Sequence, residues 1–487
     1  MKMWSGRFRQ PLDPEFERWQ RSFDFDRRLL RYELAASGAH ARALKNAGVL
    51  TADELISILQ GLEQIAKAGN VARALLPANS GHQQSPAENT SALPEDNEAE
   101  DIHHFVEKQL AAVIGDLGYK LHTGRSRNEQ IATDLRLYVR ATIDELRHQL
   151  AEFCNAIADR AEQSGDAAMP AYTHLQKAEP VLVAHWLLAY VEMFLRDADR
   201  LADCRKRLNS CPLGSGAVAG ATLALDRAFM AQTLGFDAPT ANSLDATSDR
   251  DFAIEFVNAL SLLSMHLSRW AEEMILFSSQ EYGFLILPEA FSTGSSAMPQ
   301  KKNPDLLELV RGKAARVMGS ATTLQTLVKG LPLAYNKDLQ ETQEPVFSAA
   351  DTVIGMLPLV TGFMQAVEFN GARMNQAASS GFMNAWAAAA YLVERGVPSR
   401  LAHEAVGRAV ALAVERGCDL PKLPLADLQA IHSSFDEGFP SCLGLSEVLA
   451  LHDVPGGTAP RQVKRALEKA REQATALRSL ERIESNR

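Results

Sequence analysis

Residues 135–157 read LRLYVRATIDELRHQLAEFCNAI, and this stretch decides the fold class. Apolar side chains recur in it at steps of three or four residues, the spacing that places them on one face of an α-helix. A face that continues for this length predicts a long amphipathic helix that packs against partners of similar length. The apolar face consists of Leu135, Val139, Ile143, Leu146, Leu150, Phe153 and Ile157.

Further segments repeat this helical pattern. Residues 252–277 carry apolar side chains at the same spacing without a proline, and other candidate helices follow Pro180, Pro304 and Pro345. A proline is tolerated in the first turn of a helix, where its missing N–H has no helical partner to lose. Runs that alternate polar and apolar residues, as strands do, are almost absent. We therefore expect an all-α protein with a central bundle of about five long helices.

Changes in composition divide the chain into three expected domains. Residues 1–126 form an N-terminal helical domain, in which the polar stretch 77–100 predicts a flexible insertion. Residues 127–377 carry the long helices and form the central domain. Residues 378–487 contain shorter, alanine-rich helices that glycine and proline interrupt, and they form a C-terminal helical domain.

The overall composition excludes several classes of function. The chain has 60 acidic against 50 basic residues, and a formal charge of -10 disfavours nucleic acid as a partner. The 5 cysteines form no CxxC pair, and their odd number argues against a complete disulfide framework. The first residues lack the apolar core of a signal peptide, and no uncharged apolar run of about 18 residues occurs. We expect a soluble, cytoplasmic protein without a membrane partner.

The segment TGSSAMPQKKNP at 293–304 is the most informative polar segment. Gly294 gives the backbone freedom, and Ser295 offers a hydroxyl as a candidate proton acceptor. Lys301 and Asn303 lie just before an expected helix start, where anions are stabilised. The pattern therefore predicts an anion-binding loop with a candidate base. A solvated turn in front of a helix is the alternative interpretation.

A second segment, HTGRSRNEQ at 122–130, places two arginines and an amide just before the first long helix. Arginine side chains can hold a carboxylate through two parallel hydrogen bonds. Arg127 and Asn128 are therefore candidate ligands for an acidic substrate. The alternative is a helix-capping segment with surface arginines.

A third segment, THLQKAEP at 173–180, brings His174 next to Thr173 before another expected helix. Glu308 lies one or two turns into the helix that follows the serine loop. A carboxylate partner would orient the imidazole of His174 and raise its basicity. A structural histidine and a solvated glutamate are the alternatives.

Two further segments offer groups that suit a polar substrate. Tyr335 and Gln340, in the run YNKDLQETQE, provide neutral donors and acceptors. Ser22 and Asp26 lie one helical turn apart and suit a substrate amine, although a helix cap is an alternative role. No run of ligands with the spacing of a zinc site occurs, so no metal is expected.

Taken in order, these segments closely resemble the argininosuccinate lyases, a branch of the fumarase/aspartase superfamily. The resemblance covers essentially the whole chain, and the basic text QKK of the serine loop matches this branch. Fumarases and aspartases typically carry MPGKVNP at this place. The matching segments are GRF at 6–8, EDIH at 100–103, HTGRSRN at 122–128, THLQ at 173–176, GSSAMPQKKNP at 294–304 and YNKDLQE at 335–341.

The resemblance implies a reaction and a role for each candidate residue. The reaction is the reversible β-elimination of argininosuccinate to L-arginine and fumarate, a step of arginine biosynthesis that needs no metal or organic cofactor. Ser295 would be the general base that removes the Cβ proton. The catalytic group would also include His174, Glu308 and Lys301. The substrate would be held by Ser22, Asp26, Arg127, Asn128, Thr173, Asn303, Tyr335 and Gln340.

The resemblance also implies an assembly. The superfamily's three-domain chains pair their long-helix bundles into a homotetramer, and each active site combines segments from different subunits. The motifs of this chain lie in or beside different long helices, which agrees with shared sites. We therefore expect a second copy of the chain as the partner, with argininosuccinate, arginine and fumarate as small-molecule ligands.

Two positions depart from the family pattern. Gln343 stands where YNKDLQExK would place a lysine that contacts the arginine half of the substrate, and Trp386 with Ala387 replaces a Thr-Asp pair. Two alternative functions stay open, the first of them because these changes lie at the leaving-group end. One is another fumarate-releasing lyase that acts on a different N-succinyl compound. The other is a non-catalytic structural tetramer of the crystallin kind.

Overall fold

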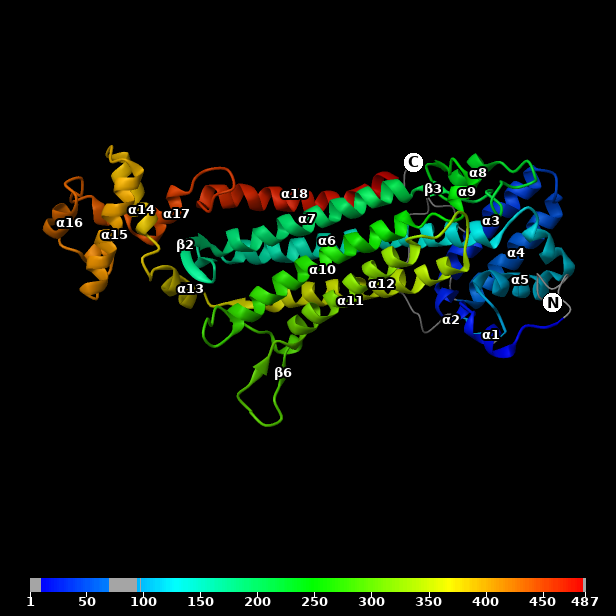
Figure 1. The fold of residues 1–487 in the computed structure, drawn as a ribbon, viewed down its shortest axis with the longest axis horizontal. Coiled ribbons are helices and arrows are strands. Elements are labelled where there is room, and N and C mark those ends of the chain that lie inside the picture. Colours follow the sequence, from blue (N-terminus) through cyan, green and yellow to red (C-terminus); the bar gives the residue numbers. More distant parts are fainter. Residues whose placement is uncertain (1–9, 70–93, 97, 485–487) are drawn as a thin grey trace.

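The computed structural model describes residues 10–69, 94–96 and 98–484. The molecule is elongated, with the N-terminal helices at one end, the long helices in the middle and short helices at the other end (Figure 1). Most of the insertion expected at 77–100 lies outside the described residues. The expectation of a mostly helical chain is confirmed.

The middle of the molecule is the expected bundle of five long helices. The first begins at Arg127 because the side chain of Ser126 caps it, and Glu129 completes a capping box. Pro304 directly precedes another of these helices, whereas Pro345 lies in the first turn of its helix. The five helices are α6 (Arg127–Gln163), α7 (Val183–Leu208), α10 (Asp251–Ser278), α11 (Asp305–Val328) and α12 (Gln343–Ala366).

A sixth long helix, α18 (Pro460–Glu484), was not expected in the C-terminal region. It returns along the bundle and packs against α6 and α7 (Figure 1). Its buried residues Val463, Ala470, Ala474 and Leu477 belong to the main core.

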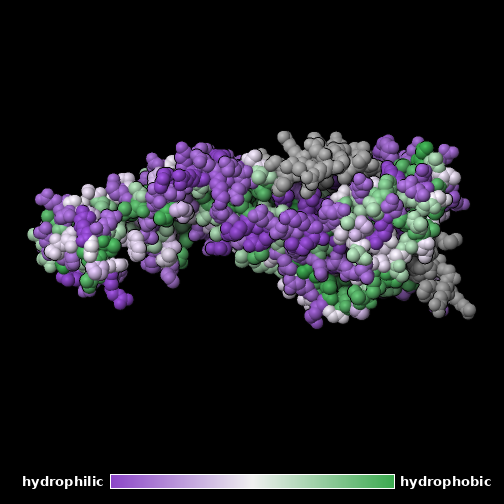
Figure 2. Space-filling model, turned by 90° about the horizontal axis from the view of Figure 1, so that it is seen from above, coloured by the Kyte–Doolittle hydropathy of each residue, from purple (hydrophilic) through white to green (hydrophobic). Residues whose placement is uncertain are grey.

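Figure 2 shows mostly hydrophilic side chains on the visible face over the middle of the molecule. The division into domains at 126 and 377 stays a prediction.

Aromatic side chains hold the bundle together. The ring of Trp270 lies 5.4 Å from that of Phe153 and 5.7 Å from that of Phe363, and Phe153 lies 4.9 Å from Phe194. Four helices therefore meet at one packed centre.

One stretch, Lys337–Ala366, is long and apolar enough to cross a membrane by length and composition. Its helix α12 packs against α6, α10 and α11, as a core helix of a soluble protein does.

The N-terminal end of the molecule positions several candidate site residues. Its helices α3, α4 and α5 pack against one another, and α3 also packs against α6. The elements are α1 (Pro14–Trp19), α2 (Phe23–Asp26), η2 (Arg27–Leu29), α3 (Leu30–Asn46), α4 (Ala52–Ala68), α5 (Ile102–Ile114), η5 (Gly115–His122), α8 (Arg227–Thr233) and α9 (Ser243–Ala246).

The opposite end consists of short helices, most of which surround a core of their own, while the first and the last of them contribute to the main core. Phe435 and Phe439 are fully buried there, with ring centroids 4.7 Å apart. The elements are α13 (Gly371–Ala378), α14 (Ala385–Glu394), α15 (Ser399–Glu415), η8 (Leu420–Lys422), α16 (Leu425–Ile431), η9 (Phe439–Cys442) and α17 (Leu445–Leu451).

The strands of the described chain form four small two-stranded sheets. Two of these pairs carry candidate site residues, and neither was expected as a strand. The pairs are β1 (Ala168–Thr173) with β2 (Gln176–Leu182), β3 (Ser210–Cys211) with β4 (Ala238–Pro239), β5 (Leu285–Ile286) with β8 (Glu368–Phe369), and β6 (Thr293–Gly294) with β7 (Lys302–Asn303). Two further short helices are η6 (Glu289–Phe291) and η7 (Lys337–Thr342).

Candidate active site

The serine loop is the tip of a hairpin that projects from the bundle. Strands β6 and β7 pair Thr293 with Asn303 and Gly294 with Lys302, so residues 295–301 form a closed loop (Figure 1). The Oγ atom of Ser295 accepts hydrogen bonds from two backbone N–H groups, of Ala297 at 3.3 Å and of Met298 at 3.2 Å. These donors would stabilise an alkoxide on Ser295. We call residues 293–303 the serine hairpin.

The serine hairpin also brings the predicted cation and amide to the same place. Asn303 closes the stem, where its Nδ2 atom donates to Thr293 Oγ1 and to Gly294 O, each at 3.4 Å. Lys301 is exposed at the loop, and Ser295 is half-buried. One short segment therefore carries a hydroxyl, an ammonium and an amide, although the amide donates to the stem of the hairpin in this chain.

His174 lies at the tip of a second hairpin. Strands β1 and β2 pair Thr173 with Gln176, so His174 and Leu175 form a two-residue turn. Both have a positive φ, 54° and 55°, which is unfavourable for residues other than glycine. Such strain persists where the surrounding structure imposes it, and it is concentrated at functional sites. His174 and Thr173 are both exposed.

The expected pair of His174 and Glu308 does not form within one chain. Glu308 is exposed in the first turn of α11, and its carboxylate lies 3.8 Å from Arg311. Among the described residues, no hydrogen bond or ion pair joins Glu308 to His174. Each group is therefore free to meet a partner from outside the chain.

Arg127 and Asn128 begin α6 at the N-terminal end of the molecule. Arg127 Nη1 lies 2.9 Å from Asp101 and 3.2 Å from Glu100, so two carboxylates fix the direction of its side chain. Asn128 donates to the carbonyl oxygen of Ala217 at 3.4 Å. Sequence reasoning did not assign Glu100 and Asp101 a role, although the EDIH segment contains both.

Ser22 and Asp26 lie close to this arginine. The Ser22 hydroxyl donates to Asp26 Oδ2 at 2.6 Å, and the backbone N–H of Ile102 donates to Asp26 Oδ1 at 3.0 Å. Burial, with the nearby charge of Asp101, raises the pKa of Asp26 from 3.8 to about 7. Both side chains are buried, whereas sequence reasoning expected groups open to a substrate.

Tyr335 and Gln340 belong to the same end of the molecule. Burial raises the pKa of the Tyr335 hydroxyl, and the charges of Asp101 and Arg127 also act on it. The side-chain amide of Gln340 donates to the carbonyl oxygen of Gln20 at 3.1 Å. Ser22, Asp26, Tyr335 and Gln340 therefore lie at the same end of the molecule as Arg127.

Arg127 and His174 lie far apart in one chain. Helix α6 contains 37 residues, which at a rise of about 1.5 Å per residue makes it about 55 Å long. Arg127 is its first residue, and the hairpin of His174 follows its last (Figure 1). One small substrate cannot contact both groups of the same chain.

The two departures from the family pattern lie in different environments. Gln343 is the first residue of α12, and only 3% of it is exposed. Its Oε1 atom has no hydrogen-bond partner among the residues that the structure describes. Trp386 is 65% exposed on α14, in the C-terminal group of short helices.

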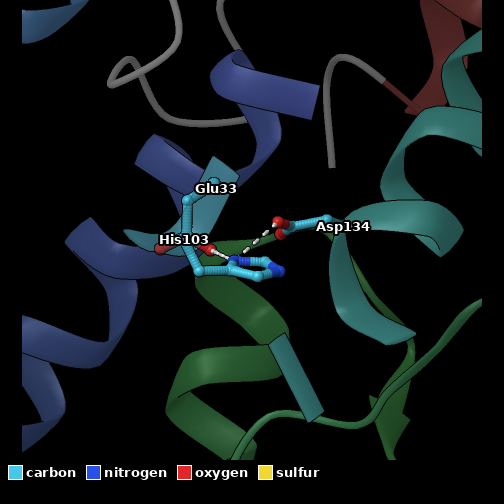
Figure 3. A group of neighbouring side chains, drawn as sticks. All are labelled: Glu33, His103 and Asp134. Atoms are coloured by element: carbon cyan, nitrogen blue, oxygen red, sulfur yellow. Dashed lines mark hydrogen bonds and ion pairs between the residues drawn. The ribbon is translucent and has the colours of Figure 1, made fainter. Parts of the chain in front are cut away.

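One group of side chains has the composition of a metal site. Glu33, His103 and Asp134 bring their ligand atoms within 4.8 Å of one another (Figure 3). However, the oxygens of Glu33 already accept hydrogen bonds from Ser37, His103 and Gln130. A carboxylate filled with protein donors has little capacity left for a cation, so the group fits a metal poorly.

The long-helix bundle, the serine hairpin and the arginine at a helix start together define a class of enzyme. The class is the lyases of the fumarase/aspartase superfamily. The family model described as Lyase matches residues 6–319, and the model described as Argininosuccinate lyase C-terminal matches residues 382–450. The chain belongs to the argininosuccinate lyase family, and it is a lyase.

Close relatives match the chain over its length. It is 58% identical to the argininosuccinate lyase of Koribacter versatilis, over 99% of this chain and 100% of that protein. It is 57% identical to the argininosuccinate lyase of Acidobacterium capsulatum, over 96% of this chain and 94% of that protein.

Solved structures agree with the fold. An EDDS lyase variant with bound fumarate matches with a TM-score of 0.80 and 25% identity, covering 98% of this chain and 93% of that chain. The class II fumarase of Schistosoma mansoni matches with a TM-score of 0.71 over 86% of this chain and 90% of that chain. At 14% identity, the second likeness concerns the fold alone.

Proposed function

We propose that this lyase splits argininosuccinate into L-arginine and fumarate, and that it does so as a homotetramer with shared active sites. The observation that carries the proposal is the serine hairpin. It holds the Ser295 hydroxyl against two backbone N–H groups, and the same hairpin carries Lys301 and Asn303. This arrangement suits proton removal next to a carboxylate.

The reaction begins with the Ser295 oxygen. Its alkoxide removes the proton from Cβ of the succinyl half, and the electron pair of that bond moves into the adjacent carboxylate. Lys301 and Asn303 hold this carboxylate while its charge grows. The N–H groups of Ala297 and Met298 lower the energy of the alkoxide before the proton is taken.

The second step breaks the bond between Cα and the guanidino nitrogen. The electron pair of the carbanion forms the double bond of fumarate, and the pair of the broken bond leaves with arginine. The departing nitrogen takes a proton from a general acid, and the proton that Ser295 took from Cβ later returns to that acid, so the alkoxide forms again. His174 is suited to this step or to binding the substrate, with Glu308 of another subunit as its partner, because both groups are exposed in one chain.

The remaining candidates divide between the two halves of the substrate. Arg127, Asn128 and Thr173 bind the carboxylates of the fumarate half. The arginine half is bound by Ser22, Asp26, Tyr335 and Gln340. Asp26 is the only carboxylate in this second set, and because only 1% of it is exposed, its charge acts on a substrate cation from a buried position.

Two features support the tetramer. The length of α6 separates Arg127 from His174 by about 55 Å, so a complete site requires segments of more than one copy. A groove of about 550 Å³ also runs between α11 and α12, where Leu309 and Leu359 are exposed. Apolar side chains on long helices are typical of a face that another subunit covers.

We also place the enzyme in the cytoplasm and keep the three-domain division at 126 and 377. Support for the first comes from the cysteines, all five of which are free. Support for the second comes from the separate core of the C-terminal short helices. Within that division, α18 extends from the C-terminal domain back along the central bundle.

The choice of substrate can be tested with a small panel. The enzyme is incubated with argininosuccinate, adenylosuccinate and ethylenediamine disuccinate, and fumarate release is measured for each. We expect the highest kcat/KM with argininosuccinate. A higher value with another N-succinyl compound would assign the enzyme to a different substrate.

The raised pKa of Asp26 predicts a pH dependence of substrate binding. Asp26 gains its negative charge as the pH rises through about 7, so KM should fall between about pH 6 and about pH 8. The same shift lowers the free energy of unfolding as the pH rises from about 4 to about 7, because the unfolded chain releases this proton at a lower pH than the folded chain. Measuring KM across this range, with Asp26→Asn as the control, is the test. A fall in KM that persists in Asp26→Asn would contradict it.

A further inference from the structure

Three ionisable side chains that the mechanism does not use meet inside the N-terminal end of the molecule. Glu33 comes from α3, His103 from α5 and Asp134 from α6, and they point toward one another (Figure 3). Their exposed fractions are 1%, 6% and 0%. Burying ionisable groups costs free energy unless they are paired, so we expect a function that explains why these three are buried together.

Glu33 is the centre of this group. It accepts hydrogen bonds from the Ser37 hydroxyl at 2.6 Å, from His103 Nδ1 at 2.8 Å and from the Gln130 amide at 3.1 Å. The guanidinium of Arg125 lies 3.7 Å from the same carboxylate. Burial acts to raise the pKa of Glu33, but the charges of His103 and Arg125 outweigh it and lower the pKa to about 2.

The pKa of Asp134 is shifted in the opposite direction from that of Glu33. Burial, with repulsion from the Glu33 carboxylate, raises the pKa of Asp134 well above its usual range. Within the described part of the chain, neither of its oxygens has a hydrogen-bond partner. The ligand atoms of Asp134 and Glu33 lie within 4.8 Å of one another, so a proton on Asp134 would remove the repulsion between the two carboxyl groups.

The contacts of Glu33 lie on both sides of Arg127 in the chain. Arg125 is two residues before Arg127, and Gln130 is three residues after it, and both bind Glu33. His103 is two residues after Asp101, whose carboxylate lies 2.9 Å from Arg127 Nη1. Glu33 therefore ties together the two backbone segments that decide where the Arg127 guanidinium points.

We propose that Glu33, His103 and Asp134 form a positioning cluster that holds Arg127 in the direction in which it binds a substrate carboxylate. None of the three touches the substrate. The proposal rests on the proposed function, in which Arg127 binds the fumarate half. Because Arg127 would hold this carboxylate both before and during the reaction, a displaced arginine should weaken binding more than it slows turnover.

The experiment compares variants in the fumarate-release assay with argininosuccinate. Glu33→Asp keeps the charge but withdraws the carboxylate by about 1.5 Å, the length of one C–C bond. We expect KM to rise about tenfold, the effect of one weakened charge-assisted contact, with kcat within about threefold of wild type. Gln130→Leu is the second variant. It removes the hydrogen bond from Gln130 to Glu33 without burying a new charge, and its KM should also be higher than that of the wild type.

A matched control lies elsewhere in the bundle. Asp197 on α7 and His266 on α10 form an equally buried pair, with His266 Nδ1 2.7 Å from Asp197 Oδ2. Asp197→Asn should lower the melting temperature as Glu33→Asp does, but it should leave KM unchanged. A purely structural role of the cluster would make the two variants behave alike.

Asp134 provides a rescue test of the cluster. Asp134→Ala removes the side chain that packs beside Glu33 and should raise KM, whereas Asp134→Asn keeps a neutral side chain of the same shape there and should keep the wild-type KM. Folded Glu33→Asp and Gln130→Leu enzymes with unchanged KM would overturn the proposal. Equal KM effects in Asp197→Asn would also overturn it. A wild-type enzyme that releases no fumarate would instead contradict the proposed function.

Discussion

Ser295→Ala is expected to lower kcat by about 10²–10⁴-fold, the usual contribution of a positioned general base. The hydroxyl of Ser295 is the proposed proton acceptor, and its oxygen is the one that faces the N–H groups of Ala297 and Met298. Removing it leaves these donors without an oxygen to stabilise. Single-turnover measurements at saturating argininosuccinate give the rate of the chemical step directly.

The matched control for this variant is the next residue. Ser296 is exposed beside half-buried Ser295 in the same loop, so Ser296→Ala should be the milder change. Substrate binding should survive in Ser295→Ala, because Lys301, Asn303 and Arg127 still hold the carboxylates. A Ser296→Ala enzyme slower than Ser295→Ala would show that the base is assigned to the wrong serine. So would a Ser295→Ala enzyme that keeps more than about a tenth of the wild-type rate.

The second large effect is expected from mixing two inactive enzymes. His174→Ala and Ser295→Ala should each be nearly inactive alone, while hybrid tetramers should regain roughly a quarter of the wild-type activity. The reason is that a shared site takes His174 from one subunit and Ser295 from another. In a random mixture, each of the two required groups is intact about half of the time.

The measurement is fumarate release after the two variants are unfolded together and refolded as a mixture. Each variant refolded alone is the control, and native mass spectrometry establishes that hybrids have formed. Hybrids that remain inactive would show that His174 and Ser295 act from the same subunit. Activity in either variant refolded alone would show that its substitution does not inactivate the enzyme.

The long helices could be predicted because their apolar faces persist over many turns. The stripe from Leu135 to Ile157 lies within α6, and the prolines at 304 and 345 mark helix starts. The helix α18 was not predicted because its sequence is rich in charged residues and its apolar face is narrow. The hairpin of β1 and β2 was missed because Pro170 and Pro180, which pair with each other, interrupt any alternating pattern.

The candidate site shows a similar division. Ser295, Lys301 and Asn303 could be predicted together because one continuous segment carries all three, and a hairpin closes it. Glu33 and His103 could not, because 70 residues separate them and each alone is an ordinary helix residue. Their role depends on which helix faces meet. Local sequence patterns do not contain that information.

The distance between Arg127 and His174 could not be predicted from the sequence, for a different reason. Motif order showed that the two segments lie beside different helices, but it did not show which end of the bundle each one occupies. The unbroken length of α6 decides this, because it carries Arg127 at its start and leads to the His174 hairpin at its end. The second subunit of the proposed site is argued from that geometry.

The central claim is that this chain converts argininosuccinate into arginine and fumarate. The most direct test is to incubate the purified enzyme with argininosuccinate and to measure both products over time by chromatography. We expect arginine and fumarate to appear in equal amounts as the substrate disappears, and argininosuccinate to form when the two products are supplied instead. An enzyme that forms neither product from argininosuccinate, while it is folded and tetrameric, would contradict the account.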